Sequence, residues 1–279
     1  MTLFKKIFFE LNKNYNLYKI SKIFPKDKIN PILKYNRKTL KKIDHWIDDD
    51  VYDRSIFNYG LPQRVKHLID NELNEDITYT DAILCLSTFL KKDVNYLELG
   101  VSVGKNFFQM ANFFKNSNLT GFDIEEINPK LESFFCRGNR EEWETEAKSL
   151  KKTNSSLTEY FYPPNHNNIK YLSGDIFDEK SWQRLSGNKF NVIFSDAFHS
   201  PDAILHEYLM IKKYEILDDD QFILIWDDLG GEMEIAFNQI WSEVCRKYNL
   251  NNECKIRVRL NGWIGLNVHE IGIITNCQN

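Results

Sequence analysis

Residues 94–104 read Val-Asn-Tyr-Leu-Glu-Leu-Gly-Val-Ser-Val-Gly. A short apolar strand is predicted to end at Glu98, and the chain then turns through Gly100 and Gly104. Because glycine lets backbone and ligand approach closely, this turn is expected at the edge of a parallel sheet, where a nucleotide-like cofactor would bind. The dinucleotide fingerprint GxGxxG is absent, and the acid before the first glycine would repel a pyrophosphate and attract a cation.

Four further apolar segments downstream are also predicted to be strands, and each ends near an acidic residue. The segments span residues 118–124, 169–172, 190–194 and 221–226. The acids that follow or end them are Asp123, Asp175, Asp196 and the pair Asp227 and Asp228. In open α/β sheets ligands bind outside the carboxyl ends of the strands. We therefore expect these acids to converge on one crevice.

The acid of the second strand has a specific predicted role. Asp123 stands nineteen positions after Gly104, at the expected end of that strand. An acid about 20 residues past a glycine turn is placed to accept the ribose hydroxyls of a nucleoside. Glu125 and Glu126 stay open as alternatives, since strand ends are placed from sequence only to within a few residues.

From about residue 80 to residue 279, the chain resembles the class I S-adenosylmethionine (SAM) dependent methyltransferases, whose first motif is acid-x-Gly-x-x-x-Gly. The resemblance implies an α/β fold: a Rossmann-like, doubly wound, seven-stranded, mostly parallel sheet with an antiparallel last strand. In this chain, an N-terminal helical extension is expected to precede that sheet. It also implies that the glycine loop holds the methionine part of SAM. The loop residues are Glu98, Gly100, Val101, Ser102 and Gly104.

The same resemblance implies roles for residues after the third and fourth strands. Asp175 is expected to receive the adenine amino group, and Ile176 or Phe177 to pack on the adenine ring. Asp196 is expected to border the cofactor as well. An NAD-dependent Rossmann oxidoreductase is the competing interpretation, against which Glu98 and the missing GxGxxG speak.

The acids of the last two strands suggest what is methylated. Asp227 and Asp228 follow Asp196 by 31 and 32 positions, which resembles O-methyltransferases of the catechol and macrocin types. In those families such acids bind one Mg²⁺ that holds two neighbouring acceptor hydroxyls. Asp196, Asp227 and Asp228 are therefore predicted metal ligands, and Mg²⁺ a predicted cofactor. Helix capping by Asp196 and Asp228 is the alternative explanation.

A histidine near Asp196 is the predicted base. His199 has an ordinary pKa near 6.5 and could remove the proton of an acceptor hydroxyl, with Asp196 as its catalytic partner. His206, seven positions on, is a second candidate for which a structural role is preferred. The segment after Asp196 lacks the two prolines and aromatic of the enzymes that methylate amino groups of adenine or glutamine.

Two domains are predicted: a basic, mainly helical extension over residues 1–79 and the methyltransferase domain over residues 80–279. The spacing between the second and third strands exceeds that of an ordinary crossing, so residues 131–168 are predicted to be an insertion with a charged helix near its middle. Two roles for this insertion stay open: it could fold over the crevice, or it could add to the surface without a role in the site. Pro25 and Pro31 are expected to break the basic segment into two pieces.

The charge is strongly asymmetric along the chain. The 279 residues carry a formal net charge of −4, of which residues 1–43 contribute +10 and the remainder −14. Apolar residues at helical spacing near the N-terminus fit a helix on an anionic membrane surface, on the domain itself, or on a second copy in a homo-oligomer. Nucleic acid is not expected as a partner, because the body carrying the site is acidic.

The cysteine content and the N-terminal sequence predict a cytoplasmic protein, with a peripheral membrane contact as the open alternative. Its five cysteines form no CxxC pair, and the N-terminus lacks the features of a signal peptide. The predicted function is transfer of methyl from SAM to a hydroxyl of a sugar or another polyhydroxy small molecule. Metal-independent transfer with His199 alone, and a SAM-binding module without turnover, are the two alternatives.

Overall fold

The computed structural model describes residues 20–43, 76–138, 157–251, 254–261 and 268–277. The helices are α2 (Lys26–Ile43), α5 (Tyr79–Ser87), α6 (Lys105–Phe113), α7 (Pro129–Glu132), α9 (Glu179–Gln183), α10 (Pro201–Lys213) and α11 (Glu232–Tyr248), with a 3₁₀ turn η3 (Pro163–Asn165). The strands are β1 (Asn95–Leu99), β2 (Asn118–Asp123), β3 (Cys136–Arg137), β4 (Leu157–Tyr162), β5 (Asn167–Ser173), β6 (Val192–Ser195), β7 (Ile223–Trp226), β8 (Lys255–Asn261) and β9 (Val268–Thr275).

These strands form one sheet in the order β3-β4-β5-β2-β1-β6-β7-β9-β8. The five central strands, from β5 to β7, pair in parallel, whereas β9 runs antiparallel between β7 and β8. The order reverses at β1, whose Leu99 lies opposite Phe122 of β2 on one side and Ser195 of β6 on the other. At such a reversal the connections leave in opposite directions and a crevice opens at the carboxyl ends of the strands.

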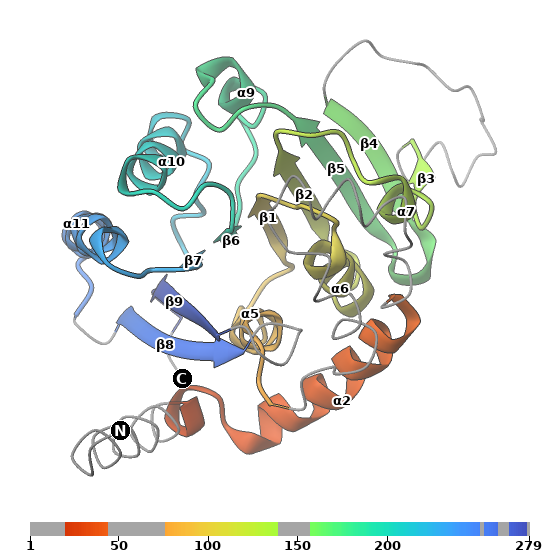
Figure 1. Cartoon of the computed structure of the whole chain (residues 1–279), viewed down its shortest axis with the longest axis horizontal. Helices are drawn as coiled ribbons and strands as arrows, with labels where there is room; N and C mark the ends of the chain where they lie inside the picture. Colours follow the sequence, from red (N-terminus) through yellow and green to blue (C-terminus); the bar gives the residue numbers. More distant parts are fainter. Residues whose placement is uncertain (1–19, 44–75, 139–156, 252–253, 262–267, 278–279) are drawn as a thin grey trace, which may run out of the picture.

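The predicted Rossmann-like arrangement is confirmed, and two strands are added to the seven expected. β3 and β4 come from the predicted insertion: β4 pairs antiparallel with β5, and β3 pairs antiparallel with β4. The described part of the insertion therefore lengthens one edge of the sheet and lies away from its centre (Figure 1). The charged helix expected within the insertion falls on residues 139–156, outside the described residues.

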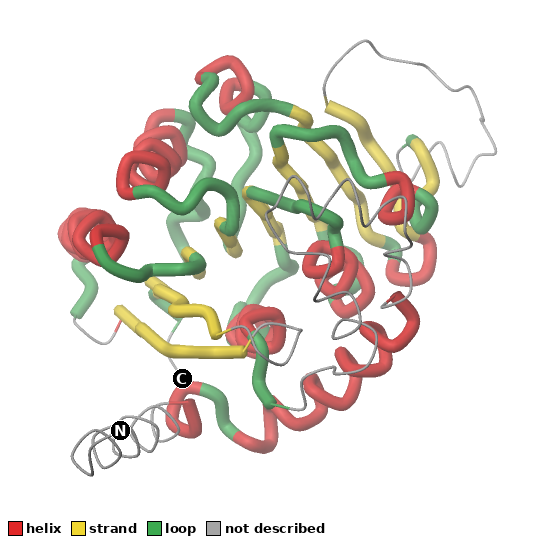
Figure 2. Tube along the Cα trace, viewed as in Figure 1, coloured by secondary structure: helices red, strands yellow, loops and turns green. Residues whose placement is uncertain are grey.

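Helices cover both faces of the sheet (Figures 1 and 2). α9, α10 and α11 lie on one face, and α5 and α6, with α2 outside them, lie on the other. Each face has its own hydrophobic core, because side chains alternate along each strand: Tyr96 of β1 joins the α5–α6 core, and Leu97 joins the α10–α11 core. The central strands are therefore buried on both sides, and only their ends are open to a ligand.

The predicted break at Pro25 is present, since one helical stretch ends at Ile23 and α2 begins at Lys26, but the helix continues through the second proline. α2 runs through Pro31, which stands six residues into the helix. The missing N–H of Pro31 removes the bond to Asp27 only, near the first turn, so most of the ladder is kept. The apolar residues Ile29, Ile32 and Leu40 bury one face of α2 against the domain. The amphipathic helix predicted near the N-terminus lies outside the described residues.

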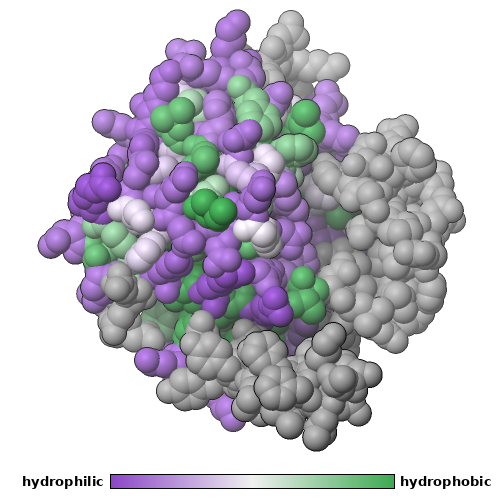
Figure 3. Space-filling model, turned by 60° about the vertical axis from the view of Figure 1, so that its left-hand side comes forward, coloured by the Kyte–Doolittle hydropathy of each residue, from purple (hydrophilic) through white to green (hydrophobic). Residues whose placement is uncertain are grey.

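No helix in the described part of the chain is both long and apolar enough to cross a lipid bilayer. The face shown in Figure 3 is mainly hydrophilic, with small, separate hydrophobic patches between charged and polar residues. The described surface on this side therefore presents no continuous apolar area.

A buried ion pair joins α2 to the domain. The Arg37 guanidinium lies 2.7 and 3.2 Å from the two carboxylate oxygens of Asp81, whose side chain has no exposed surface. Asn36 donates to the same carboxylate at 2.8 Å, and Asp81 also completes a capping box with Thr78 at the start of α5. One carboxylate thus stabilises the start of α5 and its contact with α2.

Replacing Arg37 by methionine should destabilise the protein by about 3 kcal/mol, because Asp81 would stay buried without its cation. The free energy of unfolding, from denaturant titration, measures this effect. The matched control is Lys38→Met on the exposed side of the same helix, which should change the free energy by less than about 0.5 kcal/mol. Equal effects of the two substitutions would contradict the role of the pair.

Candidate active site

The glycine loop after β1 packs directly against the end of β6. Gly100 has a φ of +79°, and a Cβ on it would lie 2.4 Å from the carbonyl oxygen of Asp196 and 2.6 Å from the Cα of Ala197. Real Cβ atoms do not approach backbone atoms so closely, so no other residue fits without displacing one of the two strand ends. Glycine is therefore required at position 100, because the loops after β1 and β6 are in contact there.

The second glycine begins the next helix. Gly104 has a φ of +82° and precedes α6, and a Cβ there would lie 2.5 Å from the Leu131 side chain. Between the glycines, Ser102 has a φ of +56°, and its N–H donates to Asp123 Oδ2 at 2.8 Å. The loop is held in an unusual conformation by the end of β2.

Asp123 lies where the sequence places it, at the last position of β2. Its Oδ2 accepts from Ser102 and its Oδ1 accepts from the N–H of Glu125 at 3.0 Å. Each carboxylate oxygen can accept a further hydrogen bond. Glu125 and Glu126, the two alternatives, are exposed. Of the three acids, Asp123 is the one whose carboxylate accepts a hydrogen bond from the glycine loop at Ser102.

Glu98 lies beneath the loop rather than on its open side. Its carboxylate accepts from the Tyr96 hydroxyl at 2.6 Å and from the Asn106 amide at 2.9 Å, and only 1% of the residue is exposed. Burial raises its pKa well above the ordinary value, although both hydrogen bonds oppose the shift. In this arrangement Glu98 joins β1 to the first turn of α6.

Apolar side chains surround the predicted adenine position. Asp175 is exposed and accepts from the N–H of Phe177 at 2.8 Å, while Ile176 is buried. The Phe177 ring, 46% exposed, meets Phe198 edge-on at 6.2 Å between centroids. Ile124, directly after Asp123, is 71% exposed. Exposed apolar side chains at the end of a sheet provide surfaces on which a planar ring can pack.

A histidine bridges two of the predicted metal ligands. His199 Nε2 lies 2.9 Å from Asp196 Oδ1, and its Nδ1 lies 3.3 Å from Asp228 Oδ2. The hydrogen bond to Asp196 is the main cause that raises the pKa of His199 to about 9, against the opposing effect of burial. At neutral pH the imidazole therefore carries a positive charge between the two carboxylates. His199 must lose a proton before it can act as a base, and separation from Asp196 would favour that loss.

The second acid of the pair after β7 is strained, and the first is buried. Asp228 has a φ of +50°, and its N–H donates to Asp227 Oδ1 at 2.7 Å. The side chain of Asp227 has no exposed surface, and burial raises its pKa to about 6. Its other oxygen, Oδ2, lies 2.6 Å from Nδ1 of His269.

His269 is the site residue that the sequence interpretation missed. It is the second residue of β9, which begins at Val268, whereas the sequence indicates a last strand of Gly272 to Thr275 only. A strand antiparallel to β7 begins at the edge where β7 ends, so a histidine at its start belongs to the crevice. The Tyr79 ring packs against this imidazole at 4.9 Å.

The capping explanation for the acids is wrong. α10 is capped by the Ser200 side chain and α11 begins after Gly231, so neither Asp196 nor Asp228 stands at a helix N-cap.

A cation fits the donor set of this edge, since carboxylate oxygens are the ligands that Mg²⁺ prefers. Within the described residues, Asp227, Asp228 and His269 each offer a ligand atom within 4.8 Å of the others. Asp196, the third predicted metal ligand, is not in this set, because the His199 ring lies between Asp196 and Asp228.

The other candidate base is placed apart from this cluster. His206 of α10 lies beside Phe177, with 5.5 Å between ring centroids, and its Nε2 is buried without a hydrogen-bond partner. The next residue, Glu207, is fully buried and accepts from Trp226 Nε1 at 3.0 Å. Trp226 is the residue before Asp227, so Glu207 supports the strand end that carries the acid pair.

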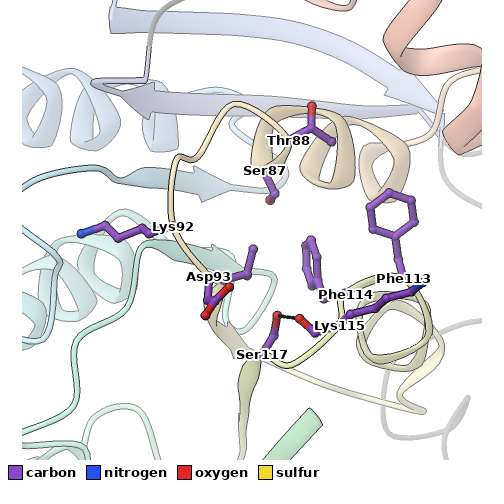
Figure 4. Close-up of a pocket in the computed structure, with 9 residues that line it drawn as sticks. Ser87, Thr88, Lys92, Asp93, Phe113, Phe114, Lys115 and Ser117 are labelled. Carbon is purple, nitrogen blue, oxygen red and sulfur yellow. Dashed lines mark hydrogen bonds between the residues drawn. The ribbon is translucent and has the colours of Figure 1, made fainter. Parts of the chain in front are cut away.

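A separate cavity of about 300 Å³ opens at the other end of the central strands, opposite the strand-end acids (Figure 4). It lies at the amino ends of β1 and β2, between the ends of α5 and α6. Its lining residues are Ser87, Thr88, Lys92, Asp93, Val94, Phe113, Phe114, Lys115 and Ser117. The Lys92 ammonium is paired with Asp218 at 2.7 Å. This cavity is remote from the strand-end acids.

No protein-family model and no curated protein matches the sequence. Among solved structures, the chain is similar to the MycE methyltransferase of the mycinamycin biosynthetic pathway in complex with Mg and S-adenosylhomocysteine (SAH), at 12% identity and a TM-score of 0.38, over 67% of this chain and 46% of that one. It is also similar to human methyltransferase-like protein 13 with SAH, at 14% identity and a TM-score of 0.42, over 71% and 82%.

A third similar structure is the N-methyltransferase NodS from Bradyrhizobium japonicum WM9 with SAH, at 15% identity and a TM-score of 0.38, over 88% of this chain and 100% of that one. Each of these three proteins is named as a methyltransferase or a methyltransferase-like protein. The chain spans less than half the length of the MycE chain. At these identities and TM-scores, the likeness assigns no activity to this protein.

The buried Glu207 should make stability depend on pH. Burial raises its pKa from 4.5 to about 7, so between these values the folded state binds more protons than the unfolded state. Its contribution is present in full below pH 4.5 and is lost as the pH rises through 7. Glu207→Gln should therefore lessen the fall in unfolding free energy between pH 5 and pH 8 by about 2 kcal/mol.

Denaturant titrations at the two pH values measure this difference. The control is Glu243→Gln, which changes an exposed glutamate on α11 and should leave the pH dependence as in the wild type. A variant at position 207 whose stability falls with pH as steeply as that of the wild type would contradict the assignment.

Proposed function

We propose that this protein is a SAM-dependent methyltransferase that acts on a hydroxyl of a sugar or another polyhydroxy small molecule, with a divalent cation such as Mg²⁺ assisting. One observation carries the proposal: the glycine loop of β1 is in direct contact with the backbone of Asp196 and Ala197, next to the Asp196–His199 pair after β6. The Cα of Gly100 faces the Asp196 carbonyl so closely that a side chain is excluded. A group bound on the loop would therefore lie beside the candidate base.

The cofactor would extend along the carboxyl ends of three strands. We assign its methionine part to the glycine loop, its ribose hydroxyls to Asp123, and its adenine amino group to Asp175. The apolar side chains of Ile124 and Phe177, which are exposed at this edge, would contact the ring. Bound SAM would supply an activated methyl group, so the protein's own residues have to orient the acceptor oxygen and take up one proton.

His199 is the proposed acceptor of that proton. As the acceptor oxygen forms its bond to the methyl carbon, the carbon–sulfur bond breaks and the hydroxyl proton passes to the imidazole. The high pKa set by Asp196 keeps His199 protonated while the two are paired. Binding of an acceptor or a cation at Asp196 would compete with this hydrogen bond, and so lower the pKa of His199 toward the range of a base.

The cation is assigned to the carboxylates of Asp227 and Asp228, and to that of Asp196 once the His199 ring, which lies between Asp196 and Asp228, has moved aside. A divalent ion held there would lower the pKa of an acceptor hydroxyl and fix its direction. A pair of neighbouring hydroxyls is the ligand such an ion can hold in two positions at once, which favours sugars and other polyhydroxy compounds. Exposed Phe198, Ile235 and Val268 provide apolar surface for the rest of the acceptor.

Metal-independent transfer is the second candidate, and one observation favours it. The His199 ring already lies between Asp196 and Asp228, at 2.9 and 3.3 Å, and offsets part of their negative charge without an ion. An Asp–His pair of this kind is sufficient for general base catalysis. The two candidates differ in whether a chelator stops turnover.

Calorimetric titration of SAH should show binding in the wild type that Asp123→Ala weakens by at least about tenfold, since a charge-assisted hydrogen bond is worth roughly 1.5–3 kcal/mol. The matched control is Glu126→Ala, which removes an exposed acid three positions away and should bind like the wild type. Loss of binding in the control but not in Asp123→Ala would move the ribose to the glutamates. Absence of binding in the wild type would overturn the proposal.

Methyl transfer from radiolabelled SAM to a panel of sugars and polyols should require Mg²⁺ and stop with EDTA. His199→Gln should lower kcat by about 10²–10⁴, because the acceptor proton would have no base, while SAH binding stays unchanged. Turnover that survives EDTA but not His199→Gln would select the metal-independent candidate. SAH binding without turnover on any acceptor would fit a module that binds SAM and performs no chemistry.

A further inference from the structure

His269 directs one ring nitrogen at the acid pair that follows β7. Its Nδ1 lies 2.6 Å from Asp227 Oδ2 and 3.7 Å from Asp228 Oδ1. The side chain is 19% exposed and the ring packs on Tyr79 at 4.9 Å. The imidazole is therefore held in one place, on the side of the pair away from the bridge that His199 makes.

The spacing of these three atoms is close to that of ligands around one ion. In an octahedron with metal–ligand bonds of about 2.1 Å, neighbouring ligand atoms are about 3 Å apart. The two distances from Nδ1, 2.6 and 3.7 Å, lie on either side of this value. Within the described residues, the three side chains form a set whose ligand atoms all lie within 4.8 Å of one another. Small side-chain movements would complete three corners of a coordination shell.

We propose that His269 is a ligand of the divalent cation assigned to Asp196, Asp227 and Asp228, and that this nitrogen donor shifts the preference of the site from Mg²⁺ toward a first-row transition-metal ion. The proposal rests on the proposed function, since it uses the same carboxylates. It adds a ligand from β9, an element that the sequence interpretation did not connect with the site.

The chemical reason is the nature of the donors. A shell of carboxylate, hydroxyl and water oxygens suits Mg²⁺, whereas imidazole nitrogen suits ions such as Co²⁺, Ni²⁺ and Zn²⁺ and is a poor ligand for Mg²⁺. Replacing one oxygen by a nitrogen therefore stabilises the transition-metal complex more than the Mg²⁺ complex. Mn²⁺ tolerates both kinds of donor and is a useful probe because it is paramagnetic.

A positioning role is the alternative for His269. It could donate its Nδ1 proton to Asp227 and orient that carboxylate without touching the ion, as residues outside a metal's ligands commonly do. Loss of affinity alone does not separate the two roles, because removing such a support also weakens binding. The roles differ in whether a nitrogen is bonded to the metal and in whether all ions lose affinity equally.

The first measurement is pulsed electron paramagnetic resonance of Mn²⁺ bound to the full-length protein, which detects coupling to a nitrogen ligand. We expect nitrogen coupling in the wild type, its loss in His269→Gln, and its retention in His199→Gln. The His199 variant is the matched control, because it removes the other imidazole of the cluster. Bound Mn²⁺ without nitrogen coupling in the wild type, or coupling lost only in His199→Gln, would overturn the proposal.

The second measurement compares calorimetric affinities for Co²⁺ and Mg²⁺. His269→Gln should lower the ratio of Co²⁺ affinity to Mg²⁺ affinity by about tenfold or more, since only the transition-metal complex loses a preferred donor. An equal loss for both ions would identify His269 as a positioning residue. If His269→Gln does not fold, the spectra of the wild type and of His199→Gln still decide the question.

SAH titration separates this proposal from the proposed function. Wild-type protein that binds SAH and Mn²⁺ but shows no nitrogen coupling retains its proposed function and loses the His269 ligand. Protein that binds Mn²⁺ with nitrogen coupling but does not bind SAH keeps the metal site and loses the methyltransferase assignment. Absence of Mn²⁺ binding overturns the His269 proposal and, with SAH bound, favours metal-independent transfer.

Discussion

The contact between Gly100 and the backbone of Asp196 and Ala197 is the constraint on which the site depends. It holds the loop after β1 against the loop after β6, at the point where the strand order of the sheet reverses. Because the approach leaves no room for a Cβ, the glycine loop and the backbone that carries Asp196 keep a fixed separation. The carboxylate of Asp123 then secures the loop from the side of β2, through the N–H of Ser102.

The cost of this arrangement is electrostatic. Glu98, Asp196, Asp227 and Asp228 gather at one edge of the sheet, where burial, together with the charges of neighbouring acids, raises the pKa of Glu98 and of Asp227. The structure offsets the repulsion with two imidazoles: His199 lies between Asp196 and Asp228, and His269 lies against Asp227. A divalent cation would neutralise the same carboxylates, so an ion and the His199 imidazole are alternative partners for Asp196 and Asp228.

Much of the fold follows from local patterns in the sequence. The apolar segments that become β1, β2, β5, β6 and β7 are short, end near acids and are separated by helical segments, which is typical of a parallel doubly wound sheet. The less regular parts were harder to predict. α2 continues through Pro31 because the proline removes only one bond near its start, and the two-residue strand β3 is too short to give a pattern.

By itself the sequence determined the strand-end acids, the glycine loop and the presence of a histidine three positions after Asp196, because these features are set by spacing within single segments. Only the tertiary structure decided that Glu98 is buried under the loop, that His199 bridges Asp196 and Asp228, and that His269 belongs to the site. The physical reason is the antiparallel direction of β9. It returns residue 269 to the edge where β7 ends, and a pairing over 42 residues leaves no periodic signal in the chain.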